Sequence, residues 1–120
     1  LIAAILNVAA MRRFRELAQR LHMAALVEIH SDDALGPAPD SGADLIGVNN
    51  RDLHTFQVSL ETSERLAERI PAGIMRVAES GIHSSADVAR LRASGFSAFL
   101  VGEHLMKSGD PAGAIRALRS

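Results

Sequence analysis

Cysteine is absent from the 120 residues, as are tryptophan and tyrosine, and phenylalanine occurs four times. The absence of cysteine excludes disulfide bonds, thiolate catalysis and cysteine-ligated metal sites, and is typical of a reducing compartment. Four phenylalanines offer little surface on which bases could stack, which disfavours the aromatic platforms that bind single-stranded nucleic acid.

An excess of either charge is also absent, because 13 basic residues stand against 14 acidic ones, for a net charge of −1. A chain without a basic excess is poorly suited to bind a phosphate backbone, so we expect no nucleic-acid partner. The longest apolar stretch starts at Leu1, is interrupted by Asn7 and ends before Arg12. It is too short to cross a bilayer and has no signal-peptide pattern, so we expect no membrane partner.

Lysine is nearly missing, since Lys107 is the only one among the basic residues. Chemistry that needs an amine of adjustable pKa therefore has one candidate in the chain. Apolar residues make up 48% of the sequence and charged ones 22%. This balance predicts a buried core, and the length predicts a single domain over residues 1–120.

Continuous apolar runs recur along the chain and are separated by helical patterns. The runs are Leu1–Leu6, Ala25–Ile29, Leu45–Val48, Ile74–Ala78 and Ala98–Val101. Runs of this kind are typical of strands buried on both faces of a parallel sheet. The helices are predicted over Val8–Leu21, Leu60–Ile70, Ser84–Ala93 and Pro111–Leu118, with a weaker one over Ser31–Ser41.

Alternation of strands and helices predicts an α/β fold of right-handed βαβ units. The segments Ala43–Gly47 and Ala98–Gly102 form a faint repeat. They are offset by 55 residues, which suggests duplicated βα pairs. Five strands cannot close an eight-stranded (β/α)8 barrel, so the chain is either an open sheet or half of such a barrel. Its start inside an apolar run, without methionine, favours a fragment whose first half is missing.

Polar residues follow the apolar runs, at the strand ends where parallel α/β folds bind ligands. Glu28 lies among aliphatic residues, which disfavour its ionised form and suit it to acid–base catalysis. Glu79 repeats the pattern, and the alternative for both carboxylates is an ion pair with an arginine. Asn49 and Arg51 leave one strand two residues apart and could both contact an anion, although Arg51 could instead pair with Asp52 or Glu28.

Two strand exits carry glycine, in Ser80–Gly81 and Gly102–Glu103. Glycine lets the backbone approach a ligand, and a short helix from Glu103 would aim its first N–H groups there, which indicates a phosphate site. The five histidines lack partners at ligand spacing, so we expect turn or surface positions and no metal. No nucleophile elbow or dinucleotide loop is present either.

Four motifs together resemble the C-terminal half of the indole-3-glycerol phosphate synthase family. They are Leu26–His30 (LVEIH), Ile46–Leu53 (IGVNNRDL) with Thr55 and Phe56, Ala78–Ile82 (AESGI), and Phe99–Met106 (FLVGEHLM) with Asp110 and Pro111. The resemblance implies the last five strands of a (β/α)8 TIM barrel, strands 4 to 8, with helices outside. It also implies conversion of 1-(2-carboxyphenylamino)-1-deoxyribulose 5-phosphate to indole-3-glycerol phosphate in tryptophan biosynthesis, in the cytoplasm and without metal or cofactor.

The resemblance also assigns the site residues. It implies catalytic roles for Glu28, Asn49 and Glu79, substrate contacts for Arg51, Leu53 and Ser80, and a phosphate cradle of Gly81, Gly102 and the Glu103 amide. The lysines that act as general acids in the family lie on strands that this chain lacks, and Lys107 does not match them. We therefore expect the isolated chain to be inactive and to need an N-terminal half-barrel or a second copy. The alternative is a non-catalytic phosphate-binding half-barrel.

Overall fold

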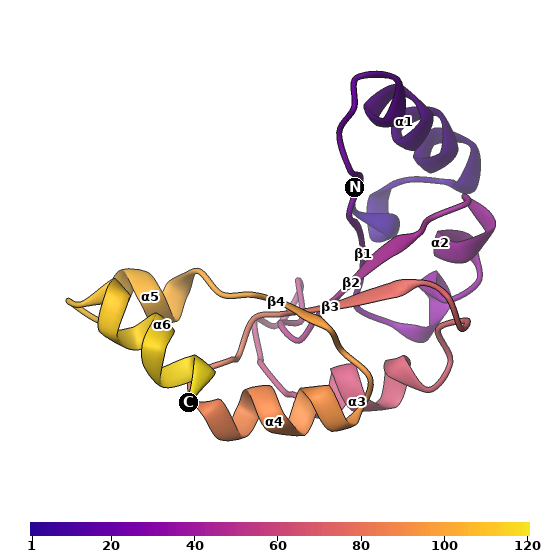
Figure 1. Cartoon of the computed structure of the whole chain (residues 1–120). Helices are drawn as coiled ribbons and strands as arrows, with labels where there is room; N and C mark the ends of the chain where they lie inside the picture. The colour runs from indigo at the N-terminus through magenta and orange to yellow at the C-terminus, as the bar shows by residue number, and fades with distance from the viewer.

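A four-stranded parallel sheet runs through the computed structural model, which describes all residues 1–120. Its strands are β1 (Val27–Ile29), β2 (Leu45–Asn49), β3 (Met75–Glu79) and β4 (Ala98–Leu100). They lie side by side in chain order and every neighbouring pair is parallel. Four of the five predicted strands are therefore confirmed, in the arrangement of half a (β/α)8 barrel (Figure 1).

The prediction of a strand over Leu1–Leu6 is wrong. Only Ile2 pairs with the sheet, in a parallel bridge to Glu28, and Ala3–Ile5 forms a 3-10 helix. The chain has to leave the sheet edge here, because the Asn7 side chain already caps the next helix by accepting from the Ala10 N–H at 2.8 Å. The apolar run could not reveal this turn, since a short apolar segment suits a strand and a helical turn equally.

Helices connect the strands, and most begin where the sequence predicts them. They are α1 (Val8–Arg20), α2 (Pro37–Asp40), α3 (Glu61–Ala67), α4 (Ser85–Ala93), α5 (Glu103–Lys107) and α6 (Pro111–Arg119), with a second 3-10 turn at Asp32–Ala34. Ser84 and Asp87 form a reciprocal capping box on α4, and Asp110 caps α6 ahead of Pro111. None of these helices has the length and apolarity required to cross a membrane.

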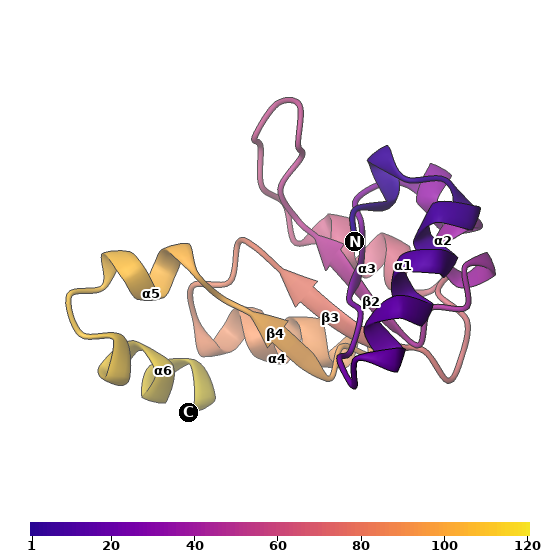
Figure 2. The same cartoon turned by 90° about the horizontal axis from the view of Figure 1, so that it is seen from above.

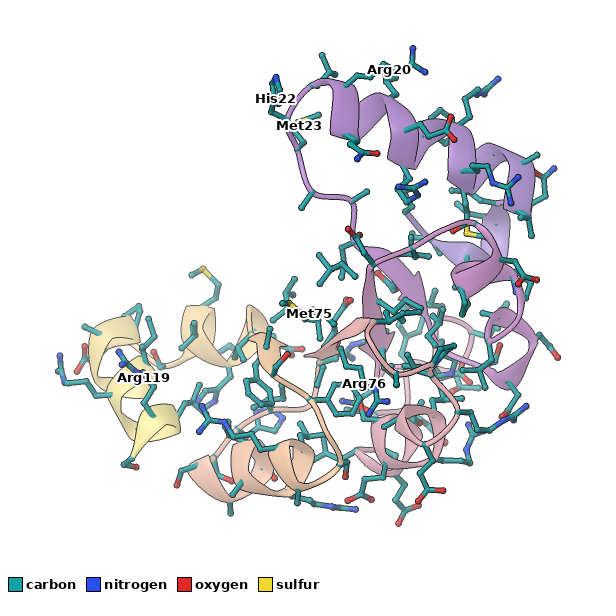
Figure 3. All side chains as sticks on the ribbon, turned by 45° about the vertical axis from the view of Figure 1, so that its right-hand side comes forward. Arg20, His22, Met23, Met75, Arg76 and Arg119 are labelled. Carbon is teal, nitrogen blue, oxygen red and sulfur yellow. The ribbon has the colours of Figure 1, made fainter.

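Helices pack on one face of the sheet, here called the outer face, and leave the opposite, inner face without helices. Val27, Ile29, Ile46, Val48 and Ala78 point to the helical side, and each is at most 2% exposed. They belong to one core cluster with Leu66 of α3 and Leu91 of α4. Because strand residues alternate between faces, Met75 points the other way from Arg76 and is 53% exposed (Figure 3).

Apolar side chains also remain uncovered at one end of the sheet. On α1 only Met11 is buried, while Phe14, Leu17 and Leu21 are exposed at 37%, 48% and 58%. Residues three and four apart share one face of a helix, so these side chains form an apolar face that stays largely exposed in this chain.

The segment after β2 rises beyond the strand ends as a hairpin-like loop (Figure 2). An isolated antiparallel bridge joins Arg51 to Val58 near its base. Within it, the Asp52 N–H donates to the Gln57 carbonyl at 2.8 Å, and the Phe56 N–H donates to the Asp52 carbonyl at 2.9 Å. This loop stands at the edge where all four strands end, and it carries several of the predicted site residues.

Candidate active site

Three predicted catalytic residues meet on the uncovered face of the sheet. Asn49, the last residue of β2, is the register partner of Glu79 in β3. Its side-chain amide donates to Glu28 Oε1 in β1 at 3.0 Å. The Asn49 side-chain oxygen accepts the Arg51 N–H at 2.9 Å, which fixes the orientation of the amide. Asn49 thus lies between two carboxylates, neither of which forms the arginine ion pair considered as the alternative.

Glu79 is the buried member of the carboxylate pair, with 5% of its surface exposed. Its Oε1 atom is buried without a hydrogen-bond partner. Burial, followed by the nearby negative charge of Glu28, raises the pKa of Glu79 to about 7. The sequence emphasised Glu28, but Glu79 is the carboxyl group that the structure prepares to hold a proton near neutral pH.

Asn50 organises the ends of β2 and β3, and no role was predicted for it from the sequence, although it lies in the Ile46–Leu53 motif. It is 1% exposed, and its N–H donates to the Glu79 carbonyl at 2.8 Å. Its side chain donates to the Ser80 carbonyl at 3.1 Å and accepts the Ser63 N–H at 3.1 Å. Its carbonyl accepts the Ser59 N–H at 3.0 Å. One buried amide side chain therefore holds the Glu79–Ser80 turn and the start of α3.

The turn after β3 consists of two residues in left-handed conformation. Ser80 has φ of +66° and Gly81 has φ of +73°. Left-handed backbone is unusual for serine, and the partly buried bond from Asn50 to the Ser80 carbonyl supports it. The pair turns the chain from the end of β3 into a cavity beside the carboxylates.

That cavity, of about 260 Å³, contains most of the remaining predicted residues. It is lined by Arg51, Ser80, Gly81, Ile82, His83, Leu100, Val101, Gly102, Glu103 and His104. Five predicted binding residues are thus brought together, while Leu53 lies elsewhere. The rings of His83 and His104, predicted as turn or surface residues, meet edge to face with centroids 5.4 Å apart.

Arg51 and Glu103 form an ion pair across the cavity, with Nη2 and Oε2 2.5 Å apart. Lys107 Nζ donates to the other carboxylate oxygen at 2.6 Å. The hydrogen bond from Lys107, with the charges of Lys107 and Arg51, lowers the pKa of Glu103. The sequence considered Asp52 or Glu28 as the partner of Arg51, and the structure selects Glu103.

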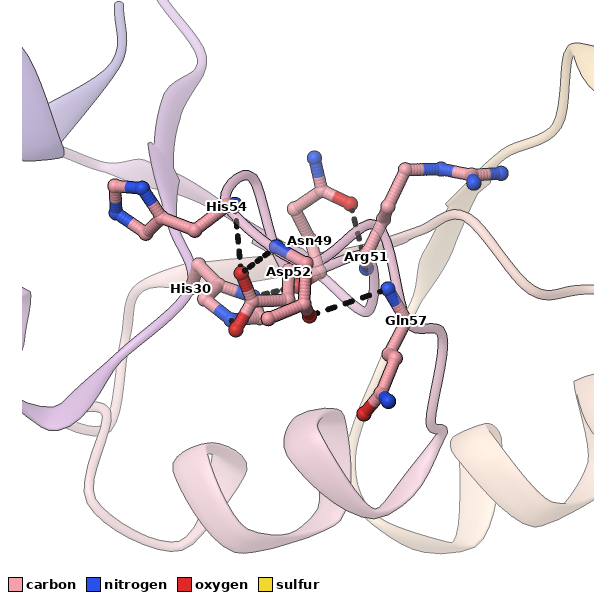
Figure 4. A network of polar contacts seen from close by, with 7 residues as sticks. His30, Asn49, Arg51, Asp52, His54 and Gln57 are labelled. Atoms are coloured by element: carbon pink, nitrogen blue, oxygen red, sulfur yellow. Dashed lines mark hydrogen bonds and ion pairs between the residues drawn. The ribbon is translucent and has the colours of Figure 1, made fainter.

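His30 and Asp52 form a polar network next to Asn49, at the ends of β1 and β2 (Figure 4). His30 Nδ1 lies 2.8 Å from the Asn49 carbonyl, and Nε2 lies 3.4 Å from Asp52 Oδ2. Asp52 accepts the N–H groups of Thr55 and His54, which lowers its pKa. The sequence treated His30 as a turn residue, although its place after β1, two residues beyond Glu28, was a usable signal.

Two further residues lie apart from this constellation. Leu53 is 39% exposed and lines a separate cavity of about 320 Å³ with His30, Asp52 and His54. The side chain of Lys107 is 75% exposed, and it pairs with Glu103 rather than approaching Glu28 or Glu79. No group of three histidine, aspartate or glutamate side chains is arranged to hold a metal ion.

Comparison of the sequence with known families gives one match over nearly its full length. Residues 1–118 match the family model described as indole-3-glycerol phosphate synthase. Proteins of that name from Koribacter versatilis and Aromatoleum aromaticum are 49% and 48% identical over 118 residues, or 98% of this chain. One from Ruminiclostridium cellulolyticum is 40% identical over 119 residues. The chain spans about 45% of the length of these relatives.

Solved structures share the fold at lower identity. The Amycolatopsis orientalis BexX/CysO complex superposes with a TM-score of 0.69 at 25% identity, over 94% of this chain and 45% of that one. Mandelate oxidase with benzoyl-formic acid gives 0.64 at 24% identity, over 95% and 34% of the two chains. These likenesses concern the parallel βα architecture. The family match spans the Glu28, Asn49 and Glu79 constellation and the adjoining cavity, and by that match the chain belongs to the indole-3-glycerol phosphate synthase family.

Proposed function

We propose that this chain supplies the C-terminal half of the active site of an indole-3-glycerol phosphate synthase. The whole enzyme would convert 1-(2-carboxyphenylamino)-1-deoxyribulose 5-phosphate to indole-3-glycerol phosphate, in the cytoplasm, by ring closure, loss of CO2 and loss of water. The observation that carries the proposal is the placement of Glu28, Asn49 and Glu79 on one face, next to a cavity that contains Arg51.

The two carboxyl groups suit different parts of proton transfer. With a pKa of about 7, Glu79 exchanges a proton readily at neutral pH. Glu28 is less enclosed and is held by the Asn49 amide, which makes it the candidate for accepting a proton from the substrate. Two carboxyl groups in contrasting environments are a recurrent basis for acid–base catalysis.

The cavity suits the phosphate end of the substrate. Arg51 provides a guanidinium group, which pairs with Glu103 in this structure, and the backbone at Gly81 and Gly102 leaves room for close approach of an anion. A Cβ atom on Gly102 would meet no other atom within 4 Å, so Gly102→Val should narrow the cavity and leave the sheet intact. We expect titrated phosphate to shift the amide signals of Ser80, Gly81, Gly102 and Glu103, and Gly102→Val to abolish those shifts. Shifts confined to other amides would contradict the assignment.

The partner of this half is the N-terminal half of the barrel. Met75 on the inner face is half exposed, as is Leu100 on the outermost strand, and the apolar face of α1 at the other end is uncovered. The relatives are longer, and this chain spans about 45% of their length. An N-terminal half would cover these surfaces and bring the family's general-acid lysines opposite Glu28 and Glu79.

Reconstitution tests the proposal directly. The chain would be expressed with the part of the Koribacter versatilis relative that it does not cover, and formation of indole-3-glycerol phosphate would be followed. We expect activity from the pair, none from either half alone, and a strongly reduced rate when Glu28→Gln replaces the native chain. A folded complex of the two halves without activity would contradict the proposal.

A second copy of the chain is the alternative partner, because β4 leaves an open strand edge that invites pairing. Sedimentation of the chain at micromolar concentration separates the two possibilities. We expect self-association when the chain is alone and a one-to-one complex when the N-terminal half is added. A monomer in both conditions would exclude both partners.

A further inference from the structure

We propose that Gly47 is a positioning residue that seats the Glu79 carboxylate over β2, so that Glu79 and Glu28 share one site. Its catalytic consequence rests on the function proposed above, whereas its structural basis does not. The Ile46–Leu53 motif and the faint repeat both include Gly47, but no role was predicted for it, and it lies inside a strand where glycine is normally unfavourable.

The position of Gly47 in the sheet places it between the two carboxylates. It is the register partner of Glu28 in β1 and of Val77 in β3. Glu79 lies two residues further along β3, and its side chain therefore reaches the same face of the sheet. The backbone of Gly47 therefore lies between the two acidic side chains, on the strand that separates β1 from β3.

The Glu79 side chain occupies the space that a side chain at position 47 would fill. A Cβ atom built on Gly47 would lie far inside van der Waals distance of Glu79 Oε1 and 3.0 Å from Glu79 Cδ. The same atom would lie 3.1 Å from Leu26 Cδ1. Since Oε1 is buried and makes no hydrogen bond, steric fit against bare backbone, rather than a polar partner, holds the carboxylate there.

A methyl group at position 47 should displace this carboxylate. The displaced Glu79 carboxylate would become less buried, would lie further from the negative charge of Glu28, or both. These two influences raise the Glu79 pKa to about 7 in the native chain. Loss of either would return the Glu79 pKa toward the ordinary value of 4.5.

The first experiment is a carbon-13 NMR titration of the Glu79 carboxyl group in the 120-residue chain. We expect the midpoint to fall from about 7 toward 4.5 in Gly47→Ala. Gly36→Ala is the control for a glycine outside the site, because a Cβ atom there meets nothing within 4 Å apart from its chain neighbours and its φ of −83° lies outside the left-handed region. An unchanged Glu79 midpoint in folded Gly47→Ala would overturn the proposal.

A double-mutant cycle with Glu79→Ala gives a second, independent result. Gly47→Ala should destabilise the native chain and have little effect, or stabilise it, once the Glu79 side chain is removed. If Gly47→Ala alone does not fold, recovery of folding in the double variant supports the proposal. If Gly47→Ala destabilises the native chain and the Glu79→Ala variant equally, or prevents both from folding, the cause is the contact with Leu26. That result would overturn the proposal.

In the reconstituted enzyme, Gly47→Ala should lower kcat by at least tenfold and leave KM within threefold, because the substrate contacts are unchanged. Gly36→Ala should change neither. The NMR midpoint and the stability cycle do not depend on turnover. A failed synthase assay with a shifted midpoint would therefore count against the proposed function, and an active synthase with an unshifted midpoint would count against the role of Gly47.

Discussion

Residues of the same strands build the two faces of the sheet, and the faces have opposite properties. The helical side carries Val27, Ile46 and Val48, which are fully buried. The other side carries Glu28, Gly47 and Asn49, interleaved with them along β1 and β2. One face therefore provides most of the apolar burial that stabilises the chain, while the other places polar groups at the cost of leaving apolar residues such as Met75 exposed.

The sharpest way to test the inner face is Glu28→Gln in the reconstituted enzyme. The substitution preserves shape and the Asn49 contact, and it removes the capacity to move a proton. We expect kcat to fall by roughly 10²–10⁴-fold with a much smaller change in substrate affinity. The measurement is steady-state kinetics. A loss below tenfold, or a rise in KM with kcat unchanged, would make Glu28 a binding residue.

Substitutions on the outer face, which packs against the helices, should lower the free energy of unfolding. Ile46 is fully buried between the sheet and the helices, so Ile46→Ala should lower the free energy of unfolding by about 2–5 kcal/mol. Urea denaturation followed by circular dichroism measures this loss. A cost below about 1 kcal/mol would mean that the helices do not stabilise the sheet as the core cluster indicates.

Glu79 links the inner face to stability through its raised pKa. An unfolded chain releases this proton near pH 4.5, whereas the folded chain keeps it to about pH 7. The resulting stabilisation is complete below pH 4.5 and is lost as the pH rises through 7, for a decrease of about 3 kcal/mol. Urea unfolding between pH 5 and pH 8, in the native chain and in Glu79→Gln, measures it. We expect the variant to lose this slope, and equal slopes would refute the assignment.

Met75→Ala should have the smallest effect, because the side chain is 53% exposed. In the isolated chain we expect a change in the free energy of unfolding of roughly 0.5 kcal/mol or less. With the N-terminal half added, the same substitution should weaken the complex, since Met75 then becomes buried. A large loss in the isolated chain would show that a second copy already covers this face.

The sequence revealed the strands and most helices because their apolar periods and caps are local signals. Ser84 with Asp87 and Asp110 with Pro111 each specify a helix start within four residues. The strand prediction for Leu1–Leu6 was wrong because the conformation of this run depends on the Asn7 cap and on the space beside β1. Strand ends located Glu28, Asn49 and Glu79, since parallel strands bring their carboxyl ends to one edge.

The parts of the site that the sequence did not reveal depend on contacts between distant residues. The Glu79 carboxylate lies against Gly47 of another strand, and the partner of Arg51 lies 52 residues away. The roles of His30 and Asn50 likewise require the register between neighbouring strands. No local pattern encodes such pairings, and the predicted catalytic and binding roles of all the site residues remain predictions.

Asn50 has a consequence for the order in which the molecule assembles. Its side chain bonds to residues 13 and 30 positions away, so both bonds form only after β2, β3 and α3 have come together. The Ser63 N–H, protected by Asn50 within a buried bond, should then exchange with solvent only when this junction opens. Its exchange rate would report the integrity of the site in a chain that has neither substrate nor partner.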